Sequence, residues 1–200
     1  FNINQVPLDD PKTLALYAKG DTNGIFQFES AGIKNVLRQL KPRTFEHIVA
    51  VNALYRPGPS RNIESFIKRR HGQEQITLLD ASLKTILAPT FGIIVYQEQV
   101  MLVAETYAGF SLGEADLLRS AMSKKKLEKM AEMHEQFVNG AVALGHNSTQ
   151  AEQIFEYIDE FANYGFNRSH AVAYSKLSFE LAYMKAHYPS AFFTALLNAN

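Results

Sequence analysis

The side chains best suited to chemistry lie in one stretch, Tyr164-Gly165-Phe166-Asn167-Arg168-Ser169-His170. Its glycine and asparagine indicate a loop, and Ser169 is of a type that begins helices. The N–H groups at a helix start attract anions, and both Arg168 and His170 can donate to phosphate oxygens. His170 could also protonate a leaving pyrophosphate. The stretch therefore predicts a polyphosphate site, and the alternative is an ordinary capped helix with an exposed arginine and histidine.

Other cationic and aromatic residues extend this prediction. Arg119 lies at the edge of an apolar helical stripe, where it either reaches a ligand or pairs with Asp116 three positions earlier. Lys124-Lys125-Lys126 follows one turn later and could meet a phosphate backbone. Tyr164 is either a core residue or a platform for a stacked base. Arg56 lies in the proline-rich loop Tyr55-Arg56-Pro57-Gly58-Pro59-Ser60 and is a further candidate phosphate contact.

Motifs of self-contained catalytic centres are missing from the sequence. It has no cysteine, no G-x-S-x-G, no H-E-x-x-H, no G-x-x-x-x-G-K-[ST] and no G-x-G-x-x-G. Two-metal chemistry needs clustered carboxylates, but the adjacent pairs Asp9-Asp10 and Asp159-Glu160 would each point about 100° apart on a helix. We therefore expect neither catalytic nor metal-ligating residues in these 200 residues.

Composition places the chain among packed globular proteins and shows segregated charge. The formal net charge is zero and 46% of the residues are hydrophobic. Residues 61–72 carry a net charge of +3 and residues 119–129 a net charge of +4, which suits a local polyanion site or, alternatively, a solvated helix face. No apolar run is long enough for a membrane span and no secretory signal is visible, so we expect a cytoplasmic protein without a membrane partner.

The periodicity of apolar residues predicts a mainly α fold, a multi-helix domain with little short β structure. Asp10-Pro11 begins a helix that reaches about Ala18, Ser30 and Thr44 each begin another, and Asn62 to His71 forms a fourth. The alternating Ile25-Phe26-Gln27-Phe28 suggests a short strand. Gly92-Ile93-Ile94-Val95 is either a short buried strand or the lead-in to a helix through Tyr107.

The second half of the chain reads as successive helices. Ser111-x-x-Glu114 is a capping box whose helix should reach about Met122. A long amphipathic helix follows from Leu127 and ends at Gly145, and Ser148 begins the next. Ser169 begins a further helix that ends at Tyr188-Pro189, and a last one fills residues 190–199. Gly109 to Ser111 is a possible domain boundary, although no linker separates the two halves.

Six ordered segments resemble the fingers region of the C-family bacterial replicative DNA polymerases, the DNA polymerase III alpha subunits. The resemblance covers nearly the whole chain through motifs of 5 to 11 residues, and chance agreement of all six is negligible. The segments are Gly24-Ile25-Phe26-Gln27-Phe28-Glu29-Ser30, Ala53-Leu54-Tyr55-Arg56-Pro57-Gly58-Pro59, Gly92-Ile93-Ile94-Val95-Tyr96-Gln97-Glu98-Gln99-Val100-Met101, Ala108-Gly109-Phe110-Ser111-Leu112-Gly113-Glu114-Ala115-Asp116, Tyr164 through Tyr174, and Lys185-Ala186-His187-Tyr188-Pro189.

The resemblance implies that residues 1–200 are one fingers region of a longer polymerase, whose metal-binding aspartates lie in a palm upstream of this chain. Fingers of this family close over the incoming deoxynucleoside triphosphate and the template base. By this resemblance Arg119, Arg168 and His170 face the triphosphate, and Tyr164 lies beside the nascent base pair. The expected cofactor is Mg²⁺, held by the palm.

The same resemblance implies partners and limits. Primer-template DNA and deoxynucleoside triphosphates are the expected substrates, and the sliding clamp and other replisome subunits would bind regions outside this chain. The isolated piece should be inactive. The family usually has a second arginine where this chain has Ser120, which puts the contribution of that position in doubt. The competing hypothesis is a non-catalytic helical module that docks proteins or nucleic acid.

Overall fold

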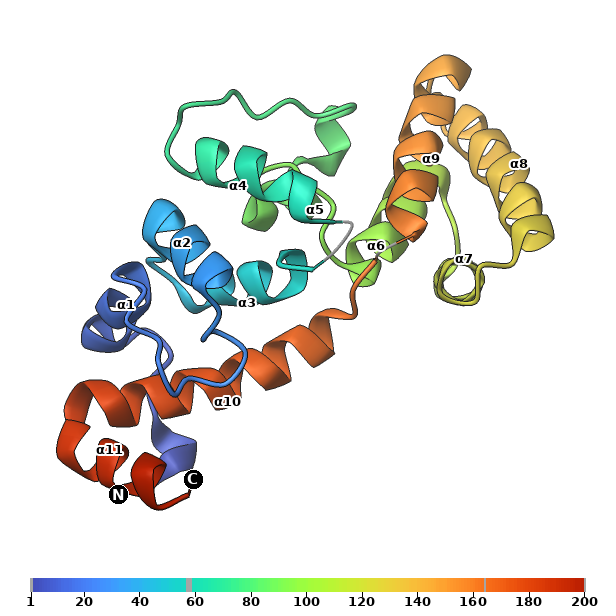
Figure 1. Cartoon of the computed structure of the whole chain (residues 1–200). Coiled ribbons are helices and arrows are strands. Elements are labelled where there is room, and N and C mark those ends of the chain that lie inside the picture. Colours follow the sequence, from blue (N-terminus) through green and yellow to red (C-terminus); the bar gives the residue numbers. More distant parts are fainter. Residues whose placement is uncertain (1, 57–58, 164, 200) are drawn as a thin grey trace. The chain divides into compact units, whose positions relative to one another are not determined.

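The computed structural model describes residues 2–56, 59–163 and 165–199, apart from the side chain of residue 59. The α-helices are α1 (Pro11–Ala18), α2 (Ala31–Leu40), α3 (Phe45–Leu54), α4 (Ile63–Arg70), α5 (Lys84–Leu87), α6 (Gln97–Ala108), α7 (Leu112–Ser123), α8 (Leu127–Ala143), α9 (Ser148–Ala162), α10 (Arg168–His187) and α11 (Pro189–Asn198) (Figure 1). Short 3₁₀ turns lie at Ile3–Gln5, Pro59–Asn62, Ala81–Leu83 and Ala88–Thr90. The mainly α prediction is confirmed.

Local capping explains why the predicted helices begin where they do. The carboxylate of Asp10 accepts the backbone N–H of Thr13 at 2.8 Å, and Pro11 follows it at the first helical position. At α7 the capping box forms in both directions, since Ser111 Oγ accepts from Glu114 N and Glu114 Oε2 accepts from Ser111 N at 2.7 Å. α9 begins at Ser148 as predicted, and the residue that caps it is Asn147.

The predicted strand at residues 25–28 is wrong. The segment forms consecutive turns, in which Ile25 N donates to Thr22 O and Phe28 N donates to Ile25 O. Gln27 has a φ of 71°, which no strand residue adopts. Ile25 and Phe28 are buried while Phe26 is exposed. The apolar residues of this segment therefore belong to turns that place two side chains in the core. Residues 92–95 are the buried lead-in to α6, and Tyr96 forms a single parallel bridge with Phe166.

The chain divides into two compact units, unit 1 with Phe1–His71 and Ser169–Asn200, and unit 2 with Gly72–Arg168. In unit 1 the α10 ring of Phe179 stacks on Tyr17 at 6.0 Å and meets Phe45 edge-on at 5.7 Å. Asn52 on α3 donates to Ser175 Oγ at 3.1 Å. These contacts join the helices of the N-terminal segment to α10, so distant parts of the sequence build one core.

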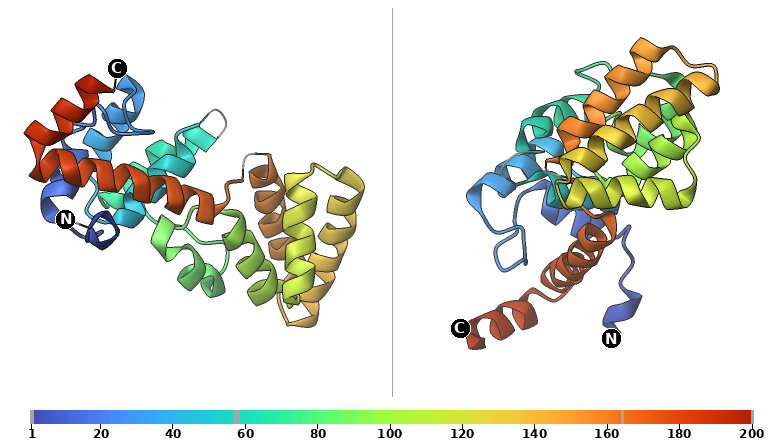
Figure 2. Two further views of the ribbon diagram at one scale, coloured as in Figure 1. Left: turned by 90° about the horizontal axis from the view of Figure 1, so that it is seen from below. Right: turned by 90° about the vertical axis from the view of Figure 1, so that its right-hand side faces the viewer.

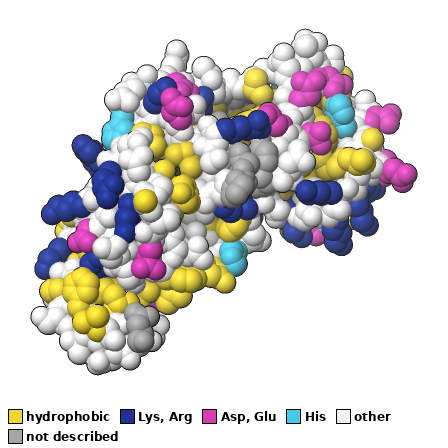
Figure 3. Space-filling view, in the orientation of Figure 1, with side chains coloured by type: hydrophobic (Ala, Val, Ile, Leu, Met, Phe, Trp, Pro, Cys, Tyr) yellow, Lys and Arg dark blue, Asp and Glu magenta, His cyan; other side chains and the backbone are white. Residues whose placement is uncertain are grey.

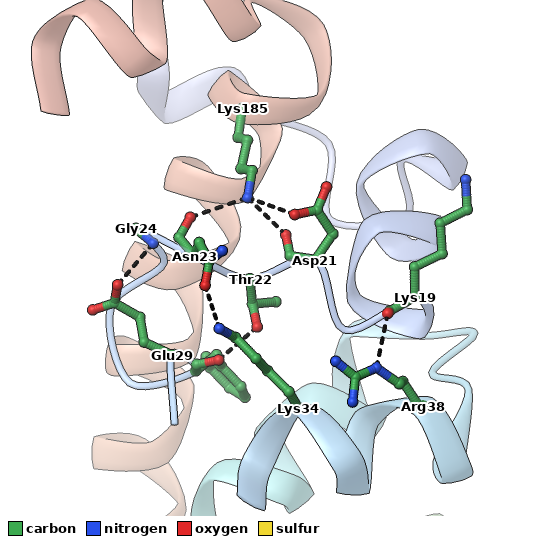
Figure 4. A network of polar contacts seen from close by, with 10 residues as sticks. Lys19, Asp21, Thr22, Asn23, Gly24, Glu29, Lys34, Arg38 and Lys185 are labelled. Atoms are coloured by element: carbon green, nitrogen blue, oxygen red, sulfur yellow. Dashed lines mark hydrogen bonds and ion pairs between the residues drawn. The ribbon is translucent and has the colours of Figure 1, made fainter. Parts of the chain in front are cut away.

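A buried lysine fixes the loop between α1 and α2 of unit 1 to α10 (Figure 4). Lys185 Nζ donates to the carbonyls of Asp21 and Asn23, at 3.0 and 3.1 Å, and to Asp21 Oδ1 at 2.8 Å. Ser178 lies about two turns before Lys185 on α10, and its Oγ donates to the carbonyl of Phe26 at 2.6 Å. The turns at residues 22–28 are therefore held by side chains of a helix that lies about 150 residues later.

Unit 2 is a helical bundle in which α8 and α9 lie side by side and α6 and α7 complete the core (Figure 2). Val100, Val103 and Tyr107 of α6 are fully buried together with Phe137 of α8. Gly140 allows the close approach of α8 to α6, because any Cβ there would overlap the carbonyl of Ala108. The possible boundary at Gly109–Ser111 lies inside this unit, between two helices that pack on each other.

Candidate functional site

Arg119 lies on the partly exposed side of α7. The adjoining side of the helix buries Ala115, Leu118 and Met122, and Arg119 lies at the edge of this buried stripe. Its side chain is 32% exposed, and Arg119 Nε and Nη2 contact Asp116 Oδ1 at 2.8 and 2.7 Å. The ion pair anticipated as the alternative is therefore formed. Asp116 is more than half exposed, so solvent weakens the pair and an incoming phosphate would compete with it.

Lys124, Lys125 and Lys126 form the exposed connection between α7 and α8. Lys124 N donates to the carbonyl of Ser120, and Lys126 N donates to that of Ala121, at 3.0 and 3.1 Å. Lys125 has a φ of 51°. The backbone is thus fixed by bonds to the last turn of α7, and the three ammonium groups are presented to solvent. Figure 3 shows a group of cationic side chains over α7 and the start of α8.

The start of α10 differs from the predicted anion site. The backbone N–H of Arg168 donates to both carboxylate oxygens of Glu98 on α6, at 2.9 and 3.1 Å. The carboxylate of Glu98 therefore accepts the hydrogen bond from the N–H group that the sequence predicted would bind phosphate. The guanidinium of Arg168 lies over the ring of Tyr96, with its Cζ 5.9 Å from the ring centroid. What Arg168 can offer a ligand is its side chain.

The first residues of α6 join the segments that carry Arg168 and Arg119. Gln97 N donates to the carbonyl of Phe166 at 2.9 Å, beside the bridge between Tyr96 and Phe166. The side chain of Gln97 donates to Ser123 Oγ at 3.1 Å, and Ser123 Oγ donates to the carbonyl of Arg119 at 2.9 Å. Two of the predicted cations are thus anchored to one turn of α6, all within unit 2.

Gly165 lies close to side chains of α9 and α6, and a residue with a Cβ would not fit there without a shift. A Cβ at this position would lie 2.8 Å from Phe161 Cε1 and 3.2 Å from Gln97 Cγ. The first contact is too short and the second is tight, so the side chains of Phe161 and Gln97 or the backbone at Gly165 would have to shift. The glycine of the predicted phosphate loop therefore serves close packing between the end of α9 and the start of α6.

His170 is the third residue of α10 and belongs to unit 1. Its ring lies 4.2 Å from that of Tyr174, at an interplanar angle of 42°, and Tyr174 in turn stacks on Phe26 at 5.5 Å. Residues two positions apart on a helix point about 200° apart, so Arg168 and His170 project from different sides of α10. Tyr174 therefore packs against the His170 imidazole.

Tyr164 and Arg56 are the remaining predicted site residues, and the structure describes only Arg56. Tyr164 lies outside the described residues. Arg56 is half-buried at the end of α3, where its Nε donates to the carbonyl of Ala53 at 2.9 Å. Burial lowers the pKa of the Arg56 guanidinium from its ordinary value. One of the donors of Arg56 is therefore committed to the end of its own helix.

Sequence analysis did not single out Tyr96, Gln97 or Glu98 as contacts of the predicted cations. Tyr96 is buried, and its ring lies beneath the guanidinium of Arg168. An acidic residue in the first turn of a helix ordinarily indicates only a favourable interaction with the helix dipole. The one available signal was that all three residues lie in a segment shared with the polymerase family.

Two kinds of feature are absent from the part of the chain that the structure describes. Among residues 2–56, 59–163 and 165–199 there is no group of three or more His, Cys, Asp or Glu arranged to hold a metal ion. In the same ranges, no helix has the length and apolar character needed to cross a bilayer.

Comparison with known proteins gives one consistent match. Residues 1–145 match the family model described as bacterial DNA polymerase III alpha subunit finger domain. The chain is 58% identical to DNA polymerase III subunit alpha of Halalkalibacterium halodurans over 98% of this chain. It is 55% identical to that of Streptococcus pyogenes over 99% of this chain, and 52% identical to that of Bacillus subtilis over 199 residues of this chain.

These matches also set the scale of the chain. It covers 18% of the Halalkalibacterium and Bacillus proteins and 19% of the Streptococcus protein. The relatives therefore contain about four fifths of their sequence outside the matched region. The high identity along this one region, together with the matched family model, shows that the chain belongs to the finger domain family of bacterial DNA polymerase III alpha subunits.

Proposed function

We propose that this chain, as part of a complete polymerase, binds the triphosphate of the incoming deoxynucleoside triphosphate and helps to position the template base. Arg119 and Arg168 would donate to the phosphate oxygens, since guanidinium forks form strong charge-assisted bonds with them. The observation that carries the proposal is the anchoring of both arginine segments to one turn of α6 through Gln97, Ser123 and Phe166. Two fixed cations lower the cost of ordering a flexible triphosphate.

Other residues complete the proposal. His170 would donate a proton to the leaving pyrophosphate, with its ring packed against that of Tyr174. Tyr164 would lie beside the nascent base pair. Lys124-Lys125-Lys126, which are exposed, and Arg56 would meet phosphates of the primer-template DNA.

The catalytic groups of the polymerase would lie outside this chain. Nucleotidyl transfer would use Mg²⁺ held by palm carboxylates. The complete polymerase would work in the cytoplasm on primer-template DNA, with the sliding clamp and other replisome subunits bound elsewhere on it. The isolated chain would be inactive, since it holds only one side of the pocket.

Single-nucleotide incorporation by the complete polymerase tests this function. Arg119→Ala and Arg168→Ala should each raise the KM for nucleotide about tenfold or more, the cost of losing a hydrogen bond to a charged group. His170→Ala should act mainly on kcat. Lys129→Ala is the matched control, because Lys129 is a cation of the same unit that already pairs with Glu132 at 2.6 Å. Wild-type kinetics in all three variants would instead favour the docking module.

Titration calorimetry on the isolated chain is an independent check. We expect weak or no heat of binding with a deoxynucleoside triphosphate, because the palm half of the pocket is missing. Tight binding by the 200-residue chain alone would contradict the division of the pocket between fingers and palm.

A further inference from the structure

Building on the proposed nucleotide site, we propose that Glu98 is a positioning residue for Arg168, and that Gln97 in the same turn of α6 positions Arg119. Neither residue needs to touch the nucleotide. Both would act by fixing the backbone from which an arginine extends.

The contact of Glu98 with Arg168 determines where α10 begins. Both carboxylate oxygens accept from the one backbone N–H of Arg168, at 2.9 and 3.1 Å. The two residues are 70 positions apart, so this bond is a tertiary constraint and no property of the local sequence. A carboxylate at a helix N-terminus is favoured by the helix dipole, and an N–H···O⁻ bond is stronger than a neutral one. Glu98 therefore holds the Cα of Arg168 against α6.

Further contacts constrain the same segment. The Arg168 guanidinium lies over Tyr96, two residues before Glu98 in the chain. Phe166 pairs with Tyr96 and accepts from Gln97 N. Gly165 lets the backbone pass against Gln97 Cγ. Residues 165–168 are thus held at several points by residues 96–98, and the side chain of Arg168 has a defined origin and direction.

Gln97 extends the arrangement to the second arginine. Its side-chain amide donates to Ser123 Oγ at 3.1 Å, and this hydroxyl donates in turn to the carbonyl of Arg119 at 2.9 Å. The link reaches the last turn of α7, in which Arg119 lies. One turn of α6 thereby contacts the backbone segments from which both cations extend. A triphosphate gripped at two points requires the separation of the two cations to be held to within about half an ångström.

Kinetics of the complete polymerase test the role of Glu98. Glu98→Ala should raise the KM for nucleotide about 3- to 30-fold, the range that follows from loss of a side-chain cap, with a smaller effect on kcat. Glu98→Gln should raise it less, because its amide oxygen can still accept from Arg168 N. Glu105→Ala is the matched control: it removes a carboxylate two turns further along the same side of α6 and should leave the KM unchanged.

A double-mutant cycle separates positioning from other roles. If Glu98 acts through Arg168, then adding Glu98→Ala to Arg168→Ala should change the KM by less than about twofold. The same reasoning applies to Gln97→Ala in the Arg119→Ala background. A general structural role would instead give multiplicative effects in both backgrounds, and that outcome would overturn the inference.

The failure of this inference is distinguishable from failure of the proposed function. Unchanged KM values in Arg119→Ala and Arg168→Ala would remove the nucleotide site itself. A raised KM in Arg168→Ala with a wild-type KM in Glu98→Ala would remove only the positioning role. If Glu98→Ala does not fold, Glu98→Gln carries the test: a wild-type KM, or a raised KM whose factor persists in the Arg168→Ala background, contradicts the role, and a raised KM that disappears there supports it.

Discussion

Lys185 Nζ lies 2.8 Å from Asp21 Oδ1, across 164 positions of sequence, and the two partners differ sharply in exposure. The lysine side chain is 5% exposed, whereas that of Asp21 is 61% exposed. A buried ammonium group needs its hydrogen bonds, and here the carbonyls of Asp21 and Asn23 supply two of them. The lysine is therefore a structural connector of the loop to α10, and its ion pair with the exposed carboxylate is the smaller part of the interaction.

Lys185→Met should loosen the loop at residues 21–29 by about 1–3 kcal/mol, because two carbonyls lose their donor while the apolar part of the side chain is kept. Hydrogen exchange of the complete polymerase should show faster exchange in this loop. Asp21→Asn should have a smaller effect, since solvent already surrounds that carboxylate.

Lys68→Met is the control for this change. Lys68 pairs with Glu64 at 2.6 Å on the surface of α4, where both side chains are largely exposed. Its removal should cost no more than about 0.5 kcal/mol. Equal protection of residues 21–29 in wild type and Lys185→Met would show that the loop is held without Lys185, by its buried Ile25 and Phe28 and the bond from Ser178.

Asp116→Asn should lower the KM for nucleotide about two- to threefold in the complete polymerase. The carboxylate of Asp116 holds two nitrogens of Arg119 and competes with phosphate for them. An exposed pair of this kind contributes about 0.2–1 kcal/mol, which sets the size of the effect. The asparagine keeps the shape of the side chain without its charge. An increased KM would indicate instead that Asp116 orients Arg119 for its ligand.

His47 should make the start of α3 sensitive to pH. Burial, followed by the charges of Arg70 and Arg43, lowers the pKa of His47 from 6.5 to about 4. The geometry agrees, because His47 Nδ1 accepts the backbone N–H of Arg43 at 3.2 Å, as an unprotonated nitrogen can. Between about pH 6.5 and 4 the unfolded form binds the proton more strongly, so the folded form loses stability as the pH falls through this window.

Hydrogen exchange of the α3 amides, corrected for intrinsic rates, measures this effect. His47→Gln should remove the loss of protection between pH 6.5 and 4, since glutamine does not titrate. Identical profiles for wild type and His47→Gln would contradict the role of this histidine.

Asp10 makes stability depend on pH in a different range. Burial raises the pKa of its carboxyl, but hydrogen bonds from His187 and Thr13 outweigh burial and leave that pKa below 3.8. Its stabilisation is lost only under more acidic conditions.

Sequence alone determined the helices, because the signals that begin and end them act within a few residues. Asp10-Pro11, Ser30, Thr44 and the pair Ser111 and Glu114 all cap helices as predicted. The strand prediction at residues 25–28 failed because alternation of apolar residues also fits consecutive turns. In this case the burial of Ile25 and Phe28 and the bonds from Ser178 and Lys185 decided between the two.

The candidate site shows the same division more sharply. The types and local spacing of residues were enough to single out Arg119 and Arg168 and to anticipate the pairing of Arg119 with Asp116. Only the tertiary structure decided that Glu98 takes the N–H of Arg168 and that Gln97 reaches Ser123. Those bonds join residues 70 and 26 positions apart, and their formation depends on how α6 packs against its neighbours rather than on any pattern within one helix.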